Sequence, residues 1–216
     1  ITSFSNHNFN SKINEIDTEL VISLEQTFSN CNKFNQSLNK WNVSKNKSLR
    51  LTFNTTNKFN QDIDLWNISN VTDIVACFQQ ASKFNTSVNN WDVSNLTNFS
   101  NVFTGTGINT GYNQSLSNWD MSNAIDISFM FESSQFNQDI SGWNVTNVTN
   151  MSSLFNQCAF NQNIRNWDVK LGDNVNNMFQ NAVNLLTGPY GTSTGFINVN
   201  GTPTVTGTGV NEYSNQ

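Results

Sequence analysis

Apolar residues recur along the chain in a fixed pattern of about twenty positions. Residues 136–155 read FNQDISGWNVTNVTNMSSLF, with apolar side chains at Phe136, Ile140, Trp143, Val145, Val148, Met151, Leu154 and Phe155. The stretch WNV alternates between apolar and polar residues, which predicts a short strand. The stretch VTNMSSLF has apolar residues three positions apart, which predicts a short helical or 3₁₀ segment.

The same pattern repeats through most of the chain. Tryptophan occurs at positions 41, 66, 91, 119, 143 and 167, always with an aromatic residue seven positions earlier and a Phe twelve positions later. Residues 9–28 fit this frame with Ile16 in the Trp position. Seven blocks therefore start at 9, 34, 59, 84, 112, 136 and 160. All variation in length lies in the connectors between blocks, which is typical of stacked coils whose loops project from one side.

The sequence thus predicts a repeat solenoid of the leucine-rich-repeat type, with about seven coils over residues 1–186. Each coil is expected to place a short parallel strand on one side and a short helical or 3₁₀ segment on the other. Phe4 precedes Phe9 as Phe131 precedes Phe136, so the chain is expected to begin inside an earlier coil. Residues 187–216 hold six of the eleven Gly and both Pro, which indicates a linker, a tail or a cap.

Composition excludes several classes of function. Charged residues make up 12% of the chain, the net charge is −5, and no cluster of Lys and Arg occurs, which argues against binding of nucleic acid. No run of about 18 apolar residues is present, so no transmembrane segment is expected. The three cysteines, Cys31, Cys77 and Cys158, have no metal-ligand spacing and predict neither a zinc site nor a disulfide framework. No metal or other cofactor is expected.

Asparagine supplies most of the polarity, with 42 residues in the chain. One Asn follows the first aromatic residue of every block, at positions 10, 35, 60, 85, 113, 137 and 161. We interpret this row as structural, with buried side-chain amides that satisfy the backbone at a corner of each coil. The alternative is a row of polar ligand contacts.

A second row of Asn and Asp follows the Trp position and is the candidate recognition face. It consists of Asp17, Asn42, Asn67, Asp92, Asp120, Asn144 and Asp168. These residues should point outward if the Trp and the aliphatic residue after it point inward. A merely solvated face and a calcium site are the alternatives, although the glycine-rich calcium repeat is absent. The Trp row itself is expected in the core rather than in an exposed polysaccharide-binding strip.

The motif Asn-x-Ser/Thr marks fourteen candidate N-glycosylation sites, which would be used only in a eukaryotic secretory pathway. They are Asn35, Asn42, Asn46, Asn54, Asn67, Asn70, Asn85, Asn95, Asn98, Asn113, Asn144, Asn147, Asn150 and Asn200. Catalysis has little support, because the single histidine, His7, has no partner for a catalytic triad or a metal site. We therefore expect a protein without enzymatic activity and assign no catalytic residues.

The segments WDVSN, VTNMSSLF and FNQDISGW resemble the BspA-like repeat of about 25 residues found in mycoplasma surface lipoproteins and other secreted microbial proteins. The segments TFSNC and LFNQC match its small-residue position. Ile16 in place of Trp, and Gly172 at an apolar position, depart from the repeat. The resemblance implies a leucine-rich-repeat relative that is displayed at a surface and acts in adhesion or recognition.

The leading functional hypothesis is an extracellular or cell-surface recognition module that binds a protein or a glycan. The alternative is a structural subunit whose coil ends stack head to tail into a homo-oligomer, a fibril or a coat, with or without N-glycans.

Overall fold

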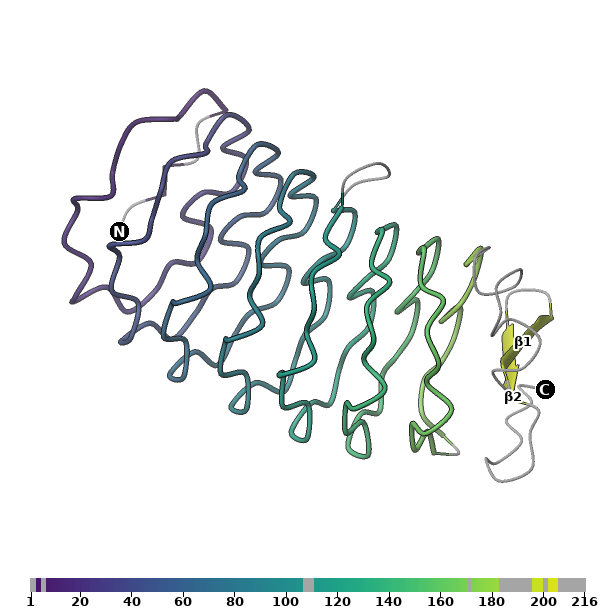
Figure 1. Cartoon of the computed structure of the whole chain (residues 1–216). Coiled ribbons are helices and arrows are strands. Elements are labelled where there is room, and N and C mark those ends of the chain that lie inside the picture. Colours follow the sequence, from purple (N-terminus) through teal and green to yellow (C-terminus); the bar gives the residue numbers. More distant parts are fainter. Residues whose placement is uncertain are drawn as a thin grey trace.

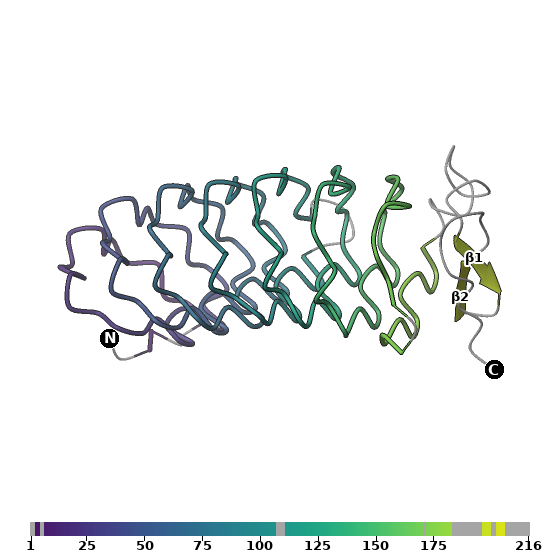
Figure 2. The same cartoon turned by 90° about the horizontal axis from the view of Figure 1, so that it is seen from below.

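The chain winds into a row of coils stacked along one axis, as the computed structural model shows (Figures 1 and 2). The structure describes residues 3–4, 7–106, 111–170, 172–182, 196–199 and 202–205. Residues one repeat apart lie side by side in neighbouring coils. The repeated blocks of the sequence are therefore the successive layers of the stack.

Backbone hydrogen bonds join each coil to the next. In the second coil the N–H of Phe53 donates to the carbonyl of Cys77, one repeat further along, at 2.8 Å. The next N–H, of Asn54, donates instead to the carbonyl of Leu51 within the same coil, at 3.2 Å. Donors thus alternate between the neighbouring coil and a local turn, so this stretch has few unpaired backbone groups.

This alternation requires left-handed backbone positions, two in each coil and four residues apart. In the second coil they are Leu51, with φ of 54°, and Thr55, with φ of 56°. The non-glycine members of the set are Gln26, Asn30, Leu51, Thr55, Ala76, Gln80, Asn101, Phe129, Ser133, Ser153, Gln157, Asn177 and Asn181. Gly105 occupies the same position as Thr55 two coils later, with φ of 63°.

The predicted solenoid of leucine-rich-repeat type, with strands on one side and helical segments on the other, is wrong. The part of the chain that the structure describes contains no helix. Where apolar residues are three positions apart, single turns do form, in which a backbone N–H donates to the carbonyl three residues earlier. The Thr56 N–H, for example, donates to the Phe53 carbonyl at 3.0 Å. A helix needs consecutive right-handed residues, and a left-handed residue every fourth position prevents one.

The predicted parallel strands at WNV are not found in the described residues, and isolated parallel bridges occur instead in the stretch predicted to be helical. These run Ser23 to Ser48 to Asp73, and Asn98 to Asp126 to Asn150 to Asn174. Around WNV, turns close on both sides: Trp41 N–H donates to Leu38 O, and Asn46 N–H donates to Val43 O. Only three residues remain between these turns, and within the described residues no bridge pairs them with a neighbouring coil, so they form no strand. The alternating pattern was therefore correct for side-chain direction but not for secondary structure.

The two named strands lie beyond the coils, in the predicted tail. Strand β1 spans Phe196–Val199 and strand β2 spans Thr202–Val205. They pair antiparallel, with Phe196 opposite Val205 and Val199 opposite Thr202. The predicted boundary at residues 186 and 187 lies outside the described residues.

Two columns of aromatic rings form the core. Phe78 stacks on Phe53 and Phe103, with centroids 5.4 and 5.7 Å away, and on Phe84, six residues further along the chain, at 4.0 Å. One column contains Phe4, Phe28, Phe53, Phe78, Phe103, Phe131, Phe155 and Phe179. The other contains Phe9, Phe34, Phe59, Phe84, Tyr112, Phe136 and Phe160. No coil could bury these rings alone, so each needs its neighbours.

The six tryptophans are buried, which confirms their expected place in the core. Each indole N–H donates to a backbone carbonyl of the preceding coil, as from Trp91 Nε1 to Ile63 O at 3.0 Å. Phe4 stacks on Phe9 at 4.6 Å, much as Phe28 stacks on Phe34 at 4.3 Å. Phe4 thus extends the first column by one ring, as the spacing predicted.

Candidate functional site

The predicted recognition face lies at a corner of the coils. All seven of its side chains, from Asp17 to Asp168, are exposed. In six of them the side-chain oxygen accepts a hydrogen bond from the backbone N–H two residues later. Asn42 Oδ1, for example, accepts from the Ser44 N–H at 3.1 Å and from the Ser44 hydroxyl at 2.7 Å. Asp168 differs, because the Lys170 N–H donates to Asp173 instead, at 2.7 Å. These short turns fix the direction of each side chain at the corner.

The turn also affects the charge at this face. The hydroxyl and the N–H of Ser122 both donate to Asp120, and this holds the pKa of the Asp120 carboxyl below its usual value. Asp139, at another corner, has a lowered pKa for the same reason, because the Ser141 N–H and hydroxyl donate to it. Both carboxyls are exposed and are ionised at neutral pH.

The row of Asn after the first aromatic residue forms a ladder between coils, which we call the first amide ladder. The Asn60 N–H donates to Asn35 Oδ1 at 3.0 Å, and the Asn85 N–H donates to Asn60 Oδ1 at 2.9 Å. The structural interpretation of this row is therefore confirmed. The side chains are exposed or half-buried rather than buried. At the last described rung the Asn161 Oδ1 is buried and has no partner among the described residues.

A further row, which we call the second amide ladder, was missed from the sequence. It contains Asn70, Asn95, Asn123 and Asn147, four positions after Trp. Each side-chain nitrogen donates to a carbonyl of the preceding coil, at 2.8–2.9 Å. In the last coil the Lys170 ammonium group makes the equivalent contact with the Thr146 carbonyl. The signal was present, because Asn recurs at this position in four successive coils.

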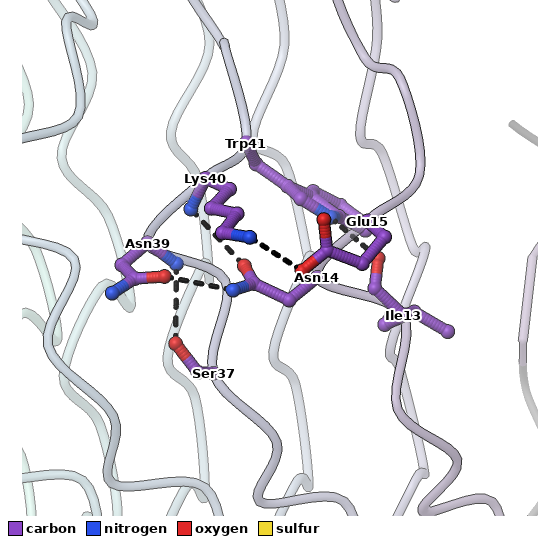
Figure 3. Close-up of polar contacts among 7 residues, drawn as sticks. All are labelled: Ile13, Asn14, Glu15, Ser37, Asn39, Lys40 and Trp41. Atoms are coloured by element: carbon purple, nitrogen blue, oxygen red, sulfur yellow. Dashed lines mark hydrogen bonds and ion pairs between the residues drawn. The ribbon is translucent and has the colours of Figure 1, made fainter.

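The first two coils are joined partly by charge (Figure 3). Lys40 Nζ lies 2.6 Å from Glu15 Oε1, and the Lys40 N–H donates to Asn14 Oδ1 at 3.0 Å. Beneath them the Trp41 indole donates to the Ile13 carbonyl at 3.0 Å. Such exposed ion pairs contribute little to stability, so the buried Trp contact is the stronger link here.

A shallow groove lies beside the recognition face. It is lined by Ser94, Asn95, Thr97, Asn123, Ile125, Asn147 and Thr149, and its volume is about 480 Å³. Ser94 is also the turn partner of Asp92, so the groove is continuous with the face. A second hollow, of about 390 Å³, lies over Leu20 and Ile22 of the first coil.

Comparison with known proteins identifies the family. Residues 2–111 and 107–191 match the family described as "Mycoplasma protein of unknown function, DUF285". The chain belongs to this family. DUF285 is related to the BspA-like repeat proteins in general. No curated protein and no solved structure matched the chain.

Most candidate glycosylation sites of this DUF285 chain have a structural use. Five begin the short turns at coil corners, where the Asn oxygen accepts the N–H of the Ser or Thr two residues later: Asn42, Asn67, Asn98, Asn144 and Asn150. Six belong to the amide ladders: Asn35, Asn70, Asn85, Asn95, Asn113 and Asn147. Asn54 donates to Gln79, Asn46 is fully buried, and Asn200 lies outside the described residues. Coil formation therefore explains the abundance of the motif, and glycosylation stays a prediction.

The three cysteines are buried and form no disulfide. Burial raises the pKa of the Cys158 thiol to about 11 and raises that of Cys77 further, so both thiols are protonated and unreactive at neutral pH.

His7 is exposed, with Nδ1 2.8 Å from Asn32 Nδ2. Within the described residues, no group of three or more His, Cys, Asp or Glu could hold a metal ion.

No helix among the described residues is long and apolar enough to cross a membrane.

Proposed function

We propose that this chain is a non-catalytic recognition or adhesion module, secreted or displayed at a cell surface, that binds a protein or a glycan. The observation that carries the proposal is the exposed row from Asp17 to Asp168. Its polar side chains recur once per coil in nearly the same orientation, because short turns fix six of the seven. A preordered polar surface of this kind loses little conformational entropy on binding.

The chemistry of the described residues also favours binding over catalysis. The four carboxyl groups of the recognition face, Asp17, Asp92, Asp120 and Asp168, each come from a different coil. Burial raises the pKa of the Cys77 and Cys158 thiols, so both are protonated at neutral pH. The relation of DUF285 to BspA-like repeat proteins supports a location at the cell surface, because the repeated segments of this chain resemble those of surface proteins. That kinship concerns the repeated sequence and carries no leucine-rich-repeat architecture with it.

Binding of the intact chain to immobilised glycans and to purified extracellular-matrix proteins tests the proposal. We expect saturable binding to at least one of them, with and without EDTA, by a chain that sediments as a monomer. If no component is bound while the chain forms long polymers, the proposal is wrong. A dependence on calcium would instead assign the Asp residues of the row to a metal site.

A structural subunit that stacks end to end is the second candidate, because one observation favours it. The buried Asn161 Oδ1 at the last described rung of the first amide ladder has no partner among the described residues. A backbone N–H from a further coil would satisfy it, and a second copy of the chain stacked end to end could supply that coil. The sedimentation measurement above distinguishes this assembly from a monomeric module.

A further inference from the structure

The groove beside the recognition face has a regular arrangement of hydrogen-bond acceptors. The side-chain nitrogens of Asn95, Asn123 and Asn147 each donate at 2.8 Å to a carbonyl of the preceding coil. This contact fixes which way each amide points. Within the described part of the chain, no hydrogen bond uses their three Oδ1 atoms. One oriented, solvent-facing carbonyl oxygen is therefore available in each of three successive coils.

The rest of the lining completes a neutral, amphipathic surface. Thr97 and Thr149 contribute hydroxyl groups that donate and accept, and Ile125 between them is 48% exposed. Backbone hydrogen bonds from Ile125 to Thr97 and from Thr149 to Ile125, at 2.8 and 2.9 Å, hold the three in line. None of the seven lining residues is ionisable. The carboxylate of Asp126, next in sequence, is already bonded to Ser128 and Asn150.

We propose that this groove binds a neutral carbohydrate chain lying along the stack axis. The inference rests on the proposed recognition function and names its ligand class and site. Sugar hydroxyls would donate to the Asn oxygens and exchange hydrogen bonds with the Thr hydroxyls, and an apolar sugar face would pack on Ile125. A polypeptide fits less well, because protein interfaces depend on aromatic, Arg and large apolar anchors, and this groove has a single Ile. A charged glycan would find no counter-charge in the lining.

The same face of the second coil supplies a suitable blocking substitution. Lys47 occupies the position of Thr97 and Thr149 there and is exposed, so a lysine is compatible with the coil at this place. The double variant Thr97→Lys, Thr149→Lys extends two charged side chains into the groove. The control is Asn90→Lys, Asn118→Lys, which adds the same charge at positions equivalent to Lys40, outside the lining.

The probe is a panel of uncharged oligosaccharides built from glucose, mannose, galactose and N-acetylglucosamine, titrated into the full chain by calorimetry. We expect at least one to bind, with affinity at least about tenfold weaker for the Thr97→Lys, Thr149→Lys variant and within about twofold for the control. Equal binding by both variants overturns the groove assignment. Binding only of a sulfated or sialylated glycan, or only of a protein, overturns the neutral-carbohydrate assignment.

The experiments distinguish failure of the groove assignment from failure of the recognition function. If the chain binds a matrix protein and the blocking variant binds it equally well, the recognition function stands and the groove inference is wrong. If the chain binds no glycan and no protein, the recognition function is wrong as well. Circular dichroism and Trp fluorescence check that both variants remain folded, which the Lys47 and Lys40 precedents lead us to expect.

Discussion

Replacing Phe78 by alanine should lower the free energy of unfolding by about 3–5 kcal/mol. The ring is fully buried and stacks on Phe53 and Phe103 of the neighbouring coils and on Phe84 of the second column. Truncation leaves a cavity in the middle of the column, and the backbone hydrogen bonds between coils limit how far the neighbours can close it. The two halves of the stack would then be joined less strongly.

Urea denaturation followed by Trp fluorescence measures this effect, since Trp91 lies 5.9 Å from Phe78. The matched control is Phe4→Ala at the start of the same column, where the ring is half-buried and, among the described residues, stacks only on Phe9 and Phe28. We expect the control to lose less than half as much stability. Equal losses at the two positions would show that stacking between coils does not determine stability. Because repeat arrays can unfold in parts, the transition is also monitored by circular dichroism.

Replacing Asn46 by valine should raise the free energy of unfolding by about 1–2 kcal/mol. Asn46 is fully buried. Among the described residues its Oδ1 has no hydrogen-bond partner, and its side-chain nitrogen makes only a long contact of 3.4 Å with the Val21 carbonyl. The equivalent positions of the next two coils hold Val71 and Leu96, both buried. Valine therefore matches the environment and removes a buried amide that lacks a full set of hydrogen bonds.

The reverse substitution, Val71→Asn, is the control and should destabilise by at least as much as Asn46→Val stabilises. Thermal unfolding reports the gain as an increase in Tm of roughly 2–4 °C for each kcal/mol in a chain of this size. A lower Tm for Asn46→Val would mean that the Asn46 amide has a hydrogen-bonding role in the coil that the buried position does not reveal.

The sequence was sufficient to predict the repeat frame and the direction of most side chains. Constant spacing around Trp fixes which residues share a layer, and alternation around WNV correctly places Trp41 and Val43 inside and Asn42 outside. These properties follow from burial alone, which depends on local apolar pattern. The burial of the Trp row was predictable for the same reason.

Secondary structure was not predictable in this way. A spacing of three apolar residues is shared by a helix and by a chain of turns, and the pattern cannot distinguish them. The deciding feature is a left-handed backbone at positions such as Leu51 and Phe129, which are residues that rarely adopt it. Contacts between coils impose that conformation, so it depends on the stack rather than on local preference. The groove was also missed, because the outward oxygens of Asn95, Asn123 and Asn147 are defined only once the ladder fixes their nitrogens.

The recurrent Asn residues join coil to coil, and hydrogen exchange of the Asn85 backbone amide measures this link. This N–H donates to the side chain of Asn60 in the preceding coil at 2.9 Å. We predict strong protection in the native chain, and in Asn60→Ala an exchange rate more than about tenfold faster at Asn85, with the Phe78 amide unchanged. If the Asn85 amide of the unmodified chain exchanges at the rate of an unstructured peptide, the Asn60 side chain does not join these two coils.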